Sequence, residues 1–287
     1  MDQFHLKKGI NMAVGYGEVD HYLDEKYIKL VKNAGFDHVR LPVSGKALEE
    51  GGEQLWDYMG QECERYLSFG LTPMLDMHGY YDINEEPRKQ WENFLSLWER
   101  LAAYLSDMDN RVVFELLNEP GLALDYKLLN ELQNEAIKRI RKTNPTRLLA
   151  AATTHANTIE NLHHLELPEN DLNIFVTIHD YTPMKFTHQG AGWMKGYERD
   201  GIVWGTPEER QYLEARYNLV TAWSQLNKRH IHLGEFGVLR AADISERTKW
   251  TEFMRNLCEE RGFGWCYWEF WHGFGIYSKK KIGRAHV

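Results

Sequence analysis

Strand-like and helix-like segments alternate along this chain with a steady period, and this alternation most constrains its fold. Eight short apolar runs have the length of buried strands. The predicted strands are Gly9–Met12, His38–Val43, Thr72–His78, Val112–Asn118, Leu148–Thr154, Asn173–His179, Ile231–Glu235 and Gly264–Glu269. Such alternation is typical of a parallel sheet whose strands are joined by crossover helices.

Helical patterns lie between the predicted strands, with a short, less regular crossover near residues 157–167. The predicted helices are Asp24–Ala34, Gln54–Phe69, Arg88–Asp107, Leu128–Arg141, Glu208–Asn227 and Ser245–Glu260. Eight strands with no composition break predict one α/β domain, a (β/α)8 TIM barrel over residues 1–278. A doubly wound sheet is the alternative, but no glycine fingerprint follows the first strand.

The end of the sequence departs from the repeating pattern. No amphipathic segment follows the eighth predicted strand, so we expect the eighth helix to be missing or truncated, leaving an apolar seam between the first and seventh helices. Residues 279–287 begin with three lysines and end in a hexapeptide that one reading frame of a common sequencing adapter encodes. We therefore expect residues 279–287 to be a non-native or disordered tail.

Bulk properties exclude several classes of partner. A net charge of −8 disfavours binding to nucleic acid or to an anionic membrane. No apolar run has the length of a membrane span. The three cysteines, Cys63, Cys258 and Cys266, are scattered and predict buried thiols, with neither a disulfide framework nor a metal-ligand spacing. We expect no cofactor. The N-terminal residues do not have the pattern of a secretory signal, which leaves the localisation open.

Two glutamates stand where predicted strands end. Glu119 follows the fourth run and precedes Pro120, and Glu235 lies between Gly234 and Phe236 in the seventh. In a (β/α)8 barrel, such positions meet at the mouth that carries the active site. Two carboxyl groups there suit cleavage of a glycosidic bond, in which one holds a proton and the other stays ionised.

Other predicted strands also finish in polar or aromatic residues. These are Asn11, Arg40, Asp76, His78, Asn118, His155, His179, Tyr181, Trp268 and Glu269. Each alone is more often a capped carboxylate, a core histidine or a rim aromatic than a site residue. Their placement on successive strand ends favours a shared site.

The motifs around these residues resemble glycoside hydrolase family 5, the family of cellulases and mannanases. The resemblance covers nearly the whole chain and rests on Val39-Arg40-Leu41-Pro42, Asp76-Met77-His78, Asn118-Glu119-Pro120, His179-Asp180-Tyr181, Gly234-Glu235-Phe236-Gly237 and Tyr267-Trp268-Glu269-Phe270. Residues 185–193, which include Trp193, resemble the bacterial branch that contains endoglucanases and glucanase/mannanase bifunctional enzymes.

The resemblance implies a retaining endo-β-1,4-glycanase that acts on β-glucan, with mannan as the alternative substrate. It makes Glu119 the general acid/base and Glu235 the nucleophile, each on the same side of the barrel. The substrate-binding residues that it implies are Arg40, His78, Asn118, His179, Tyr181, Trp268, Asn11 and Trp193. Arg40 and Tyr181 would also keep Glu235 charged and oriented. Members of the family are often secreted.

Two departures and two alternatives stay open at this point. Gly79 follows His78, where relatives in this branch often have a second histidine, and the segment Phe270-Trp271-His272-Gly273 is bulkier than expected. One alternative is a metal-dependent barrel hydrolase that uses His78, His155 and His179. The other is a barrel that binds carbohydrate without cleaving it. The oligomeric state is not readable from the sequence.

Overall fold

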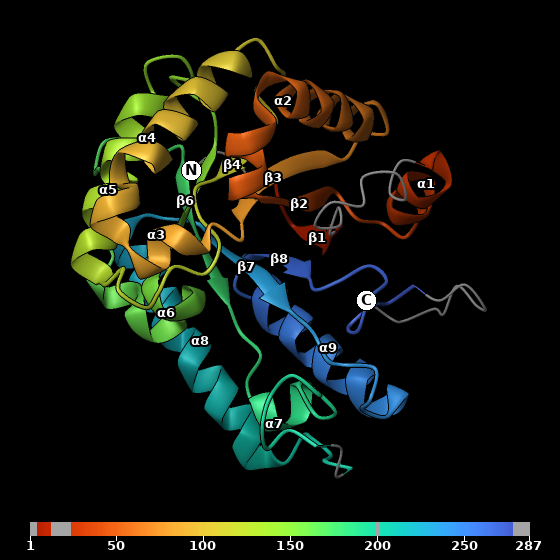
Figure 1. The fold of residues 1–287 in the computed structure, drawn as a ribbon. Coiled ribbons are helices and arrows are strands. Elements are labelled where there is room, and N and C mark those ends of the chain that lie inside the picture. The colour runs from red at the N-terminus through yellow and green to blue at the C-terminus, as the bar shows by residue number, and fades with distance from the viewer. Residues whose placement is uncertain (1–4, 13–23, 199–200, 278–287) are drawn as a thin grey trace.

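The computed structural model describes residues 5–12, 24–198 and 201–277, and they form a closed parallel barrel of eight strands in sequence order (Figure 1). The strands are β1 (Lys8–Asn11), β2 (His38–Ser44), β3 (Thr72–His78), β4 (Val113–Glu115), β5 (Leu149–Ala152), β6 (Ile174–His179), β7 (Ile231–Phe236) and β8 (Gly264–Tyr267). The predicted (β/α)8 barrel is confirmed, and the doubly wound alternative is wrong because β1 pairs with both β2 and β8.

Helices connect successive strands and surround the barrel. They are α1 (Glu25–Asn33), α2 (Gly45–Ser68), α3 (Tyr81–Glu85), α4 (Pro87–Tyr104), α5 (Tyr126–Ile140), α6 (Thr154–Asn157), the 3-10 helix η2 (Ile159–His164), α7 (Met184–Thr187), α8 (Pro207–Asn227) and α9 (Ile244–Glu259). The fifth crossover is short, as predicted. None of the described helices is both long and apolar enough to cross a membrane.

Among the predicted elements, α2 and β4 differ most from the sequence prediction. α2 begins nine residues earlier than expected, because a first helical segment continues through a kink at Gly52, whose φ of 52° and ψ of −146° are not helical. β4 is shorter than expected, since the chain leaves the regular ladder after Glu115 and turns at Glu119, whose φ is +46°. This turn brings the Glu119 side chain over the barrel mouth.

Alternate residues of the strands face the barrel interior. Met74 and Val113 join Phe175 in a small apolar cluster low in the barrel. The next inward positions on β3 and β4, Asp76 and Glu115, are charged and buried. The period-2 pattern of a strand therefore places an apolar floor beneath a polar layer. The large apolar cluster lies between the strands and the helices.

The part of the chain described after β8 contains no helix up to Tyr277. Aromatic residues of this segment pack instead on Tyr27 of α1, with ring centroids 5.9 Å away for Phe270, 5.0 Å for Trp271 and 5.6 Å for Tyr277. The expected seam beside α1 is thus partly filled by rings. The tail predicted at 279–287 lies outside the described residues. All three cysteines are buried and unpaired, as predicted.

Candidate active site

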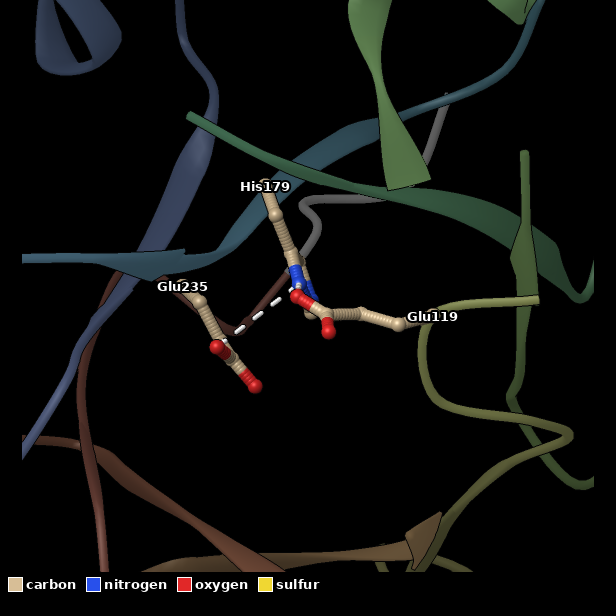
Figure 2. Close-up of side chains that lie close together, drawn as sticks. All are labelled: Glu119, His179 and Glu235. Atoms are coloured by element: carbon tan, nitrogen blue, oxygen red, sulfur yellow. Dashed lines mark hydrogen bonds and ion pairs between the residues drawn. The ribbon is translucent and has the colours of Figure 1, made fainter. Parts of the chain in front are cut away.

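Glu119 and Glu235 face each other across the barrel mouth, with His179 between them (Figure 2). A carboxylate oxygen of each glutamate and a ring nitrogen of His179 all lie within 4.8 Å of one another. Glu119 follows β4, and its backbone N–H donates to Asn157 Oδ1 at 3.0 Å. The two predicted catalytic residues therefore converge on one site, although 116 positions separate them in the sequence.

A register shift in the sheet places Glu235. Ile178 on β6 pairs with Leu233, but the next residue, His179, pairs with Glu235, so Gly234 is the extra residue on β7. A Cβ at position 234 would lie 2.3 Å from Thr177 Oγ1 and 3.2 Å from His179 Nε2. Only glycine allows this close approach, and the bulge turns Glu235 toward the site.

Arg40 is the centre of the polar layer below the catalytic pair. Its guanidinium donates to Glu235 Oε1 at 2.7 Å, to both oxygens of Glu115 at 2.6 and 2.9 Å, and to Asn118 Oδ1 at 2.8 Å. It also forms an ion pair with Asp76 at 2.9 Å. A planar group with five donors suits this many acceptors in fixed positions. Arg40 therefore fixes one oxygen of Glu235.

The charges of this layer are buried and unequal in number. Burial alone would lower the pKa of Arg40, but the carboxylates of Asp76, Glu115 and Glu235 raise it well above its ordinary value. Burial raises the pKa of Asp76 to about 7 and also raises the pKa of Glu115, while Arg40 opposes both changes. One permanent positive charge thus offsets a cluster of acids, which limits how many of them ionise together.

Asn11 and Arg40, both expected among the substrate-binding residues, lie beneath the catalytic pair. Both are fully buried. The Asn11 amide donates to the carbonyls of Gly234 and Tyr267 at 3.0 and 3.2 Å, and its oxygen accepts from Arg40 at 3.0 Å. These contacts tie β1 to β7 and β8 and orient Arg40. Both residues support the site from below.

Tyr181 and His179 contact the catalytic carboxyls directly. The Tyr181 hydroxyl donates to Glu235 Oε2 at 2.9 Å, and His179 Nδ1 lies 3.0 Å from Glu119 Oε1 and 3.7 Å from Glu235 Oε2. Burial, with Glu235 nearby, raises the pKa of Tyr181 well above its ordinary value, so its proton stays available. Burial lowers the pKa of His179 to about 4, so the ring is neutral at neutral pH.

Glu119 is held differently from Glu235. Its side chain keeps 39% of its surface exposed, whereas Glu235 keeps 6%. Partial loss of water raises the pKa of Glu119, against the opposing effects of His78 and Arg40. Glu235 accepts two hydrogen bonds, one from Arg40 and one from Tyr181. One glutamate is therefore partly open to solvent, and the other is buried and held by two donors.

Asn118, His78 and Trp268 form the wall beside this pair. His78 Nδ1 lies 2.6 Å from Asp76 Oδ2, and its ring stacks on Trp268 with centroids 5.7 Å apart and an interplanar angle of 7°. The Asn118 amide lies 3.5 Å from His78 Nε2. Asp76 thus orients His78, which in turn supports the Trp268 ring. This arrangement offers an apolar ring face next to amide and imidazole groups.

Trp193 lies further along the rim. It is 68% exposed and lines a hollow of about 500 Å³ with Tyr197 and neighbouring loop residues. Met194 and Tyr197 join a small apolar cluster that also contacts Tyr181 and Trp268. The loop that carries Trp193 is therefore anchored to the catalytic wall. His155, which has a role only in the metal-dependent alternative, is exposed in α6.

Glu115 and Asn157 are the supporting residues that the sequence prediction missed. Both are fully buried; one pairs with Arg40, and the other holds the Glu119 backbone. Glu115 could have been found from the sequence, because it is an acidic residue in an apolar run and lies two positions after Val113, so both side chains face the barrel interior. Asn157 follows no such rule, because its φ of +57° and its position depend on the turn after β5.

Glu119, His179 and Glu235 also have the ligand types and spacing that could hold a metal ion. The arrangement does not favour one, since Glu235 already accepts from Arg40 and Tyr181, and the guanidinium repels a cation. Of the histidines in the metal-dependent alternative, His155 is exposed in α6 and is not in this cluster.

Comparison with known proteins agrees with this geometry. The model of the cellulase family, glycosyl hydrolase family 5, matches residues 7–273. Endoglucanase H of Acetivibrio thermocellus is 29% identical over 258 residues, which cover 85% of this chain and 27% of that protein. This chain thus spans about a quarter of that relative.

Solved structures superpose over nearly the full chain. The cellulose synthase subunit Z of Clostridioides difficile is 36% identical with a TM-score of 0.92, covering 98% of this chain and 99% of that one. Cel5A of Thermotoga maritima in complex with mannotriose is 32% identical with a TM-score of 0.92, covering 99% and 98%. The same enzyme is also known with cellobiose. The chain belongs to glycosyl hydrolase family 5, the cellulase family, and is a glycoside hydrolase.

Proposed function

We propose that this chain is a retaining endo-β-1,4-glucanase with Glu235 as nucleophile and Glu119 as general acid/base. The observation that carries this proposal is the approach of the two carboxyl groups to within 4.8 Å, oxygen to oxygen. Retaining pairs lie about 5–5.5 Å apart, whereas inverting pairs lie about 6.5–9.5 Å apart to admit a water molecule. The short separation supports direct attack by Glu235.

In the first step, a Glu235 oxygen attacks the anomeric carbon while Glu119 gives its proton to the leaving oxygen. The bond between the anomeric carbon and the leaving oxygen breaks, and a glycosyl ester to Glu235 forms. Arg40 and Tyr181 hold the attacking carboxylate in place, and the raised pKa of Glu119 keeps its proton available. Asn118 would contact the 2-hydroxyl, and Trp268 would face the sugar ring, with His78 beside it.

In the second step, Glu119 removes a proton from water, which attacks the same carbon and releases Glu235. Glu119 must therefore change protonation state in each cycle. Neutral His179 suits this change, because its Nδ1 can accept from the acid or donate to the carboxylate, according to the tautomer. His179 would thus act as a hydrogen-bond partner of the acid/base as well as a ligand of the sugar.

The anomeric configuration of the first product tests retention. Proton NMR of early hydrolysis of a β-1,4-oligosaccharide should show the β-anomer first, with the α-anomer appearing only through mutarotation. Initial release of the α-anomer would contradict the proposed double displacement.

Variants of the two glutamates test the roles separately. Glu119→Gln should lose about 10²–10⁴-fold in activity on polysaccharide. It should lose much less on an aryl glycoside whose leaving group needs no proton. Glu235→Gln should be inactive on both substrates. If Glu119→Gln lost the same activity on the polysaccharide and on the aryl glycoside, Glu119 would not be the general acid. Binding of an oligosaccharide by Glu119→Gln and by Glu235→Gln would show that the site of each variant is intact.

Glucan is the proposed preferred substrate, and mannan is the alternative. The similarity to an endoglucanase supports glucan, and the Cel5A complexes with cellobiose and mannotriose support tolerance of both sugars. Trp193 would extend the site as an exposed ring platform. Rates on carboxymethylcellulose, barley β-glucan, lichenan, xylan and mannan decide the order. The same assays in EDTA test the metal-dependent alternative, which requires loss of activity and its recovery with zinc.

A second candidate is the same hydrolysis carried out within a cellulose-synthesising assembly. The observation that favours it is the 36% identity, over 98% of this chain, to a cellulose synthase subunit. Purification of the tagged chain from its native cells should then recover a synthase. Recovery of the chain alone, with full activity on soluble glucan, would favour an independently acting enzyme.

A further inference from the structure

The outer face of α8 carries an exposed apolar stripe with a coiled-coil spacing. Tyr212, Ala215, Leu219, Ala222 and Leu226 follow one another at intervals of three and four residues, and all five are exposed. The exposed fractions are 55% for Tyr212, 71% for Leu219 and 82% for Leu226. The opposite face of the helix buries Leu213, Tyr217 and Val220. Helix α8 is therefore apolar on two sides, although only one of them faces the barrel.

The two ends of the stripe differ in a complementary way. At the C-terminal end, Leu226 and Trp223 line a hollow of about 360 Å³ with leucines from the segment before β6, and polar groups such as Glu169 and Lys228 complete its lining. At the N-terminal end, the ring of Tyr212 is exposed, and the Arg216 guanidinium lies 5.6 Å from its centre. Tyr212 and Leu226 each lie seven residues from Leu219, about 10 Å along the helix. An exposed ring and a hollow with both leucine and polar groups in its lining thus stand at equal distances from one central leucine.

The charges at the two ends are complementary as well. Glu208 occupies the exposed position one turn before Tyr212, and Lys228 is exposed just after Leu226. Arg210 would oppose such a pairing, but its guanidinium stacks on Trp204 and Phe253 of its own chain. The five stripe positions themselves carry no charge.

We propose that α8 pairs with α8 of a second copy of this chain, antiparallel, about a two-fold axis at Leu219. In this arrangement each Tyr212 enters the hollow beside Leu226 of the other copy, and each Glu208 faces the other Lys228. An isologous interface needs a self-complementary surface, and equal spacing about Leu219 provides one. Tyrosine is a usual anchor of such contacts, because its ring packs on apolar side chains while its hydroxyl reaches polar groups. The pairing buries one helix face per copy, so the dimer is weak.

Sedimentation equilibrium over a range of protein concentrations tests this pairing. The average mass of the wild-type chain should rise toward twice the monomer mass as concentration increases. Leu219→Glu places two carboxylates at the axis and should keep the chain monomeric. Leu122→Glu is the matched control, because Leu122 is another exposed leucine, at 77%, outside the stripe, and this variant should associate like wild type. Unchanged melting temperature and hydrolysis would show that Leu219→Glu folds.

Charge reversal and cross-linking test the antiparallel register. Glu208→Lys should weaken association, and adding Lys228→Glu in the same chain should restore it. A mixture of Tyr212→Cys and Leu226→Cys chains should form a mixed disulfide dimer, with little background because the native thiols are buried. A wild-type chain that stays monomeric at its highest soluble concentration overturns the proposal and leaves the stripe to a different partner. Association that survives Leu219→Glu also overturns it.

Discussion

At the scale of single residues, Gly234 is the position on which the catalytic geometry depends most directly. Gly234→Ala would place a methyl group 2.3 Å from Thr177 Oγ1, so β6 or β7 must move. Such overpacking costs about 1–3 kcal/mol in stability. Because the same shift displaces His179 and Glu235, we expect at least about a tenfold loss of kcat as well.

Gly60→Ala is the control for this prediction. A Cβ there meets Leu105 Cδ2 at an ordinary 3.7 Å, and the position is helical. The melting temperature and kcat should fall in Gly234→Ala but not in Gly60→Ala, because only the first substitution creates a steric clash. Wild-type kcat in Gly234→Ala would mean that the bulge is not needed to aim Glu235.

The sequence predicted the residues at the mouth better than those beneath it. Glu119 and Glu235 were readable because strand ends in a barrel share one edge, whatever the exact register. The contact between Arg40 and Glu235 was expected, but the contact between Arg40 and Glu115 was not, since it depends on the pairing of β2, β3 and β4. For the same reason, the position of Asn11 at a strand end does not reveal that its amide donates to two backbone carbonyls.

At the scale of elements, aromatic rings of the segment after β8 pack on Tyr27 of α1 at the outside of the barrel. The Tyr277 N–H donates to the Phe270 carbonyl at 2.7 Å, and the two rings stack with centroids 5.1 Å apart. Arg240 and Arg247 donate to the carbonyl of Gly275 from the loop after β7 and from α9. These contacts pack the described segment after β8 against its neighbours. The strand and helix pattern predicted that no helix lies between Tyr267 and Tyr277, but it did not predict the ring cluster there.

Tyr27→Ala tests the stabilising role of this cluster. It removes a buried ring that contacts three others, and we expect a loss of roughly 2–4 kcal/mol in the free energy of unfolding. Tyr81→Ala, at a position 63% exposed, should leave the free energy of unfolding nearly unchanged. Urea denaturation measures both. If the two variants had the same free energy of unfolding, the ring cluster would not stabilise the fold.

At the scale of the whole molecule, buried acids and buried histidines oppose each other in the pH dependence of stability. Burial raises the pKa of Asp76 and of Glu269 to about 7, so the stability they contribute at low pH is lost as the pH rises through 7. Burial lowers the pKa of His179 and His188 to about 4, so their contribution is complete above about 6.5 and is lost as the pH falls toward 4. Between about pH 4 and pH 7, the stability lost from the acids and the stability gained from the histidines cancel in part.

Glu269→Gln separates one of these effects from the rest. Glu269 is buried beside Trp268, one of its oxygens has no hydrogen-bond partner, and the negative charge of Glu235 adds to the effect of burial on its pKa. Glutamine resembles the protonated acid, so the variant should match wild type near pH 4, below the ordinary pKa of a glutamate, and melt higher at pH 8. A gain of roughly 2–4 °C corresponds to about 1 kcal/mol in a large domain. Calorimetry at both pH values measures the difference, and a gain that is the same at pH 4 and pH 8 would show that Glu269 does not titrate between them.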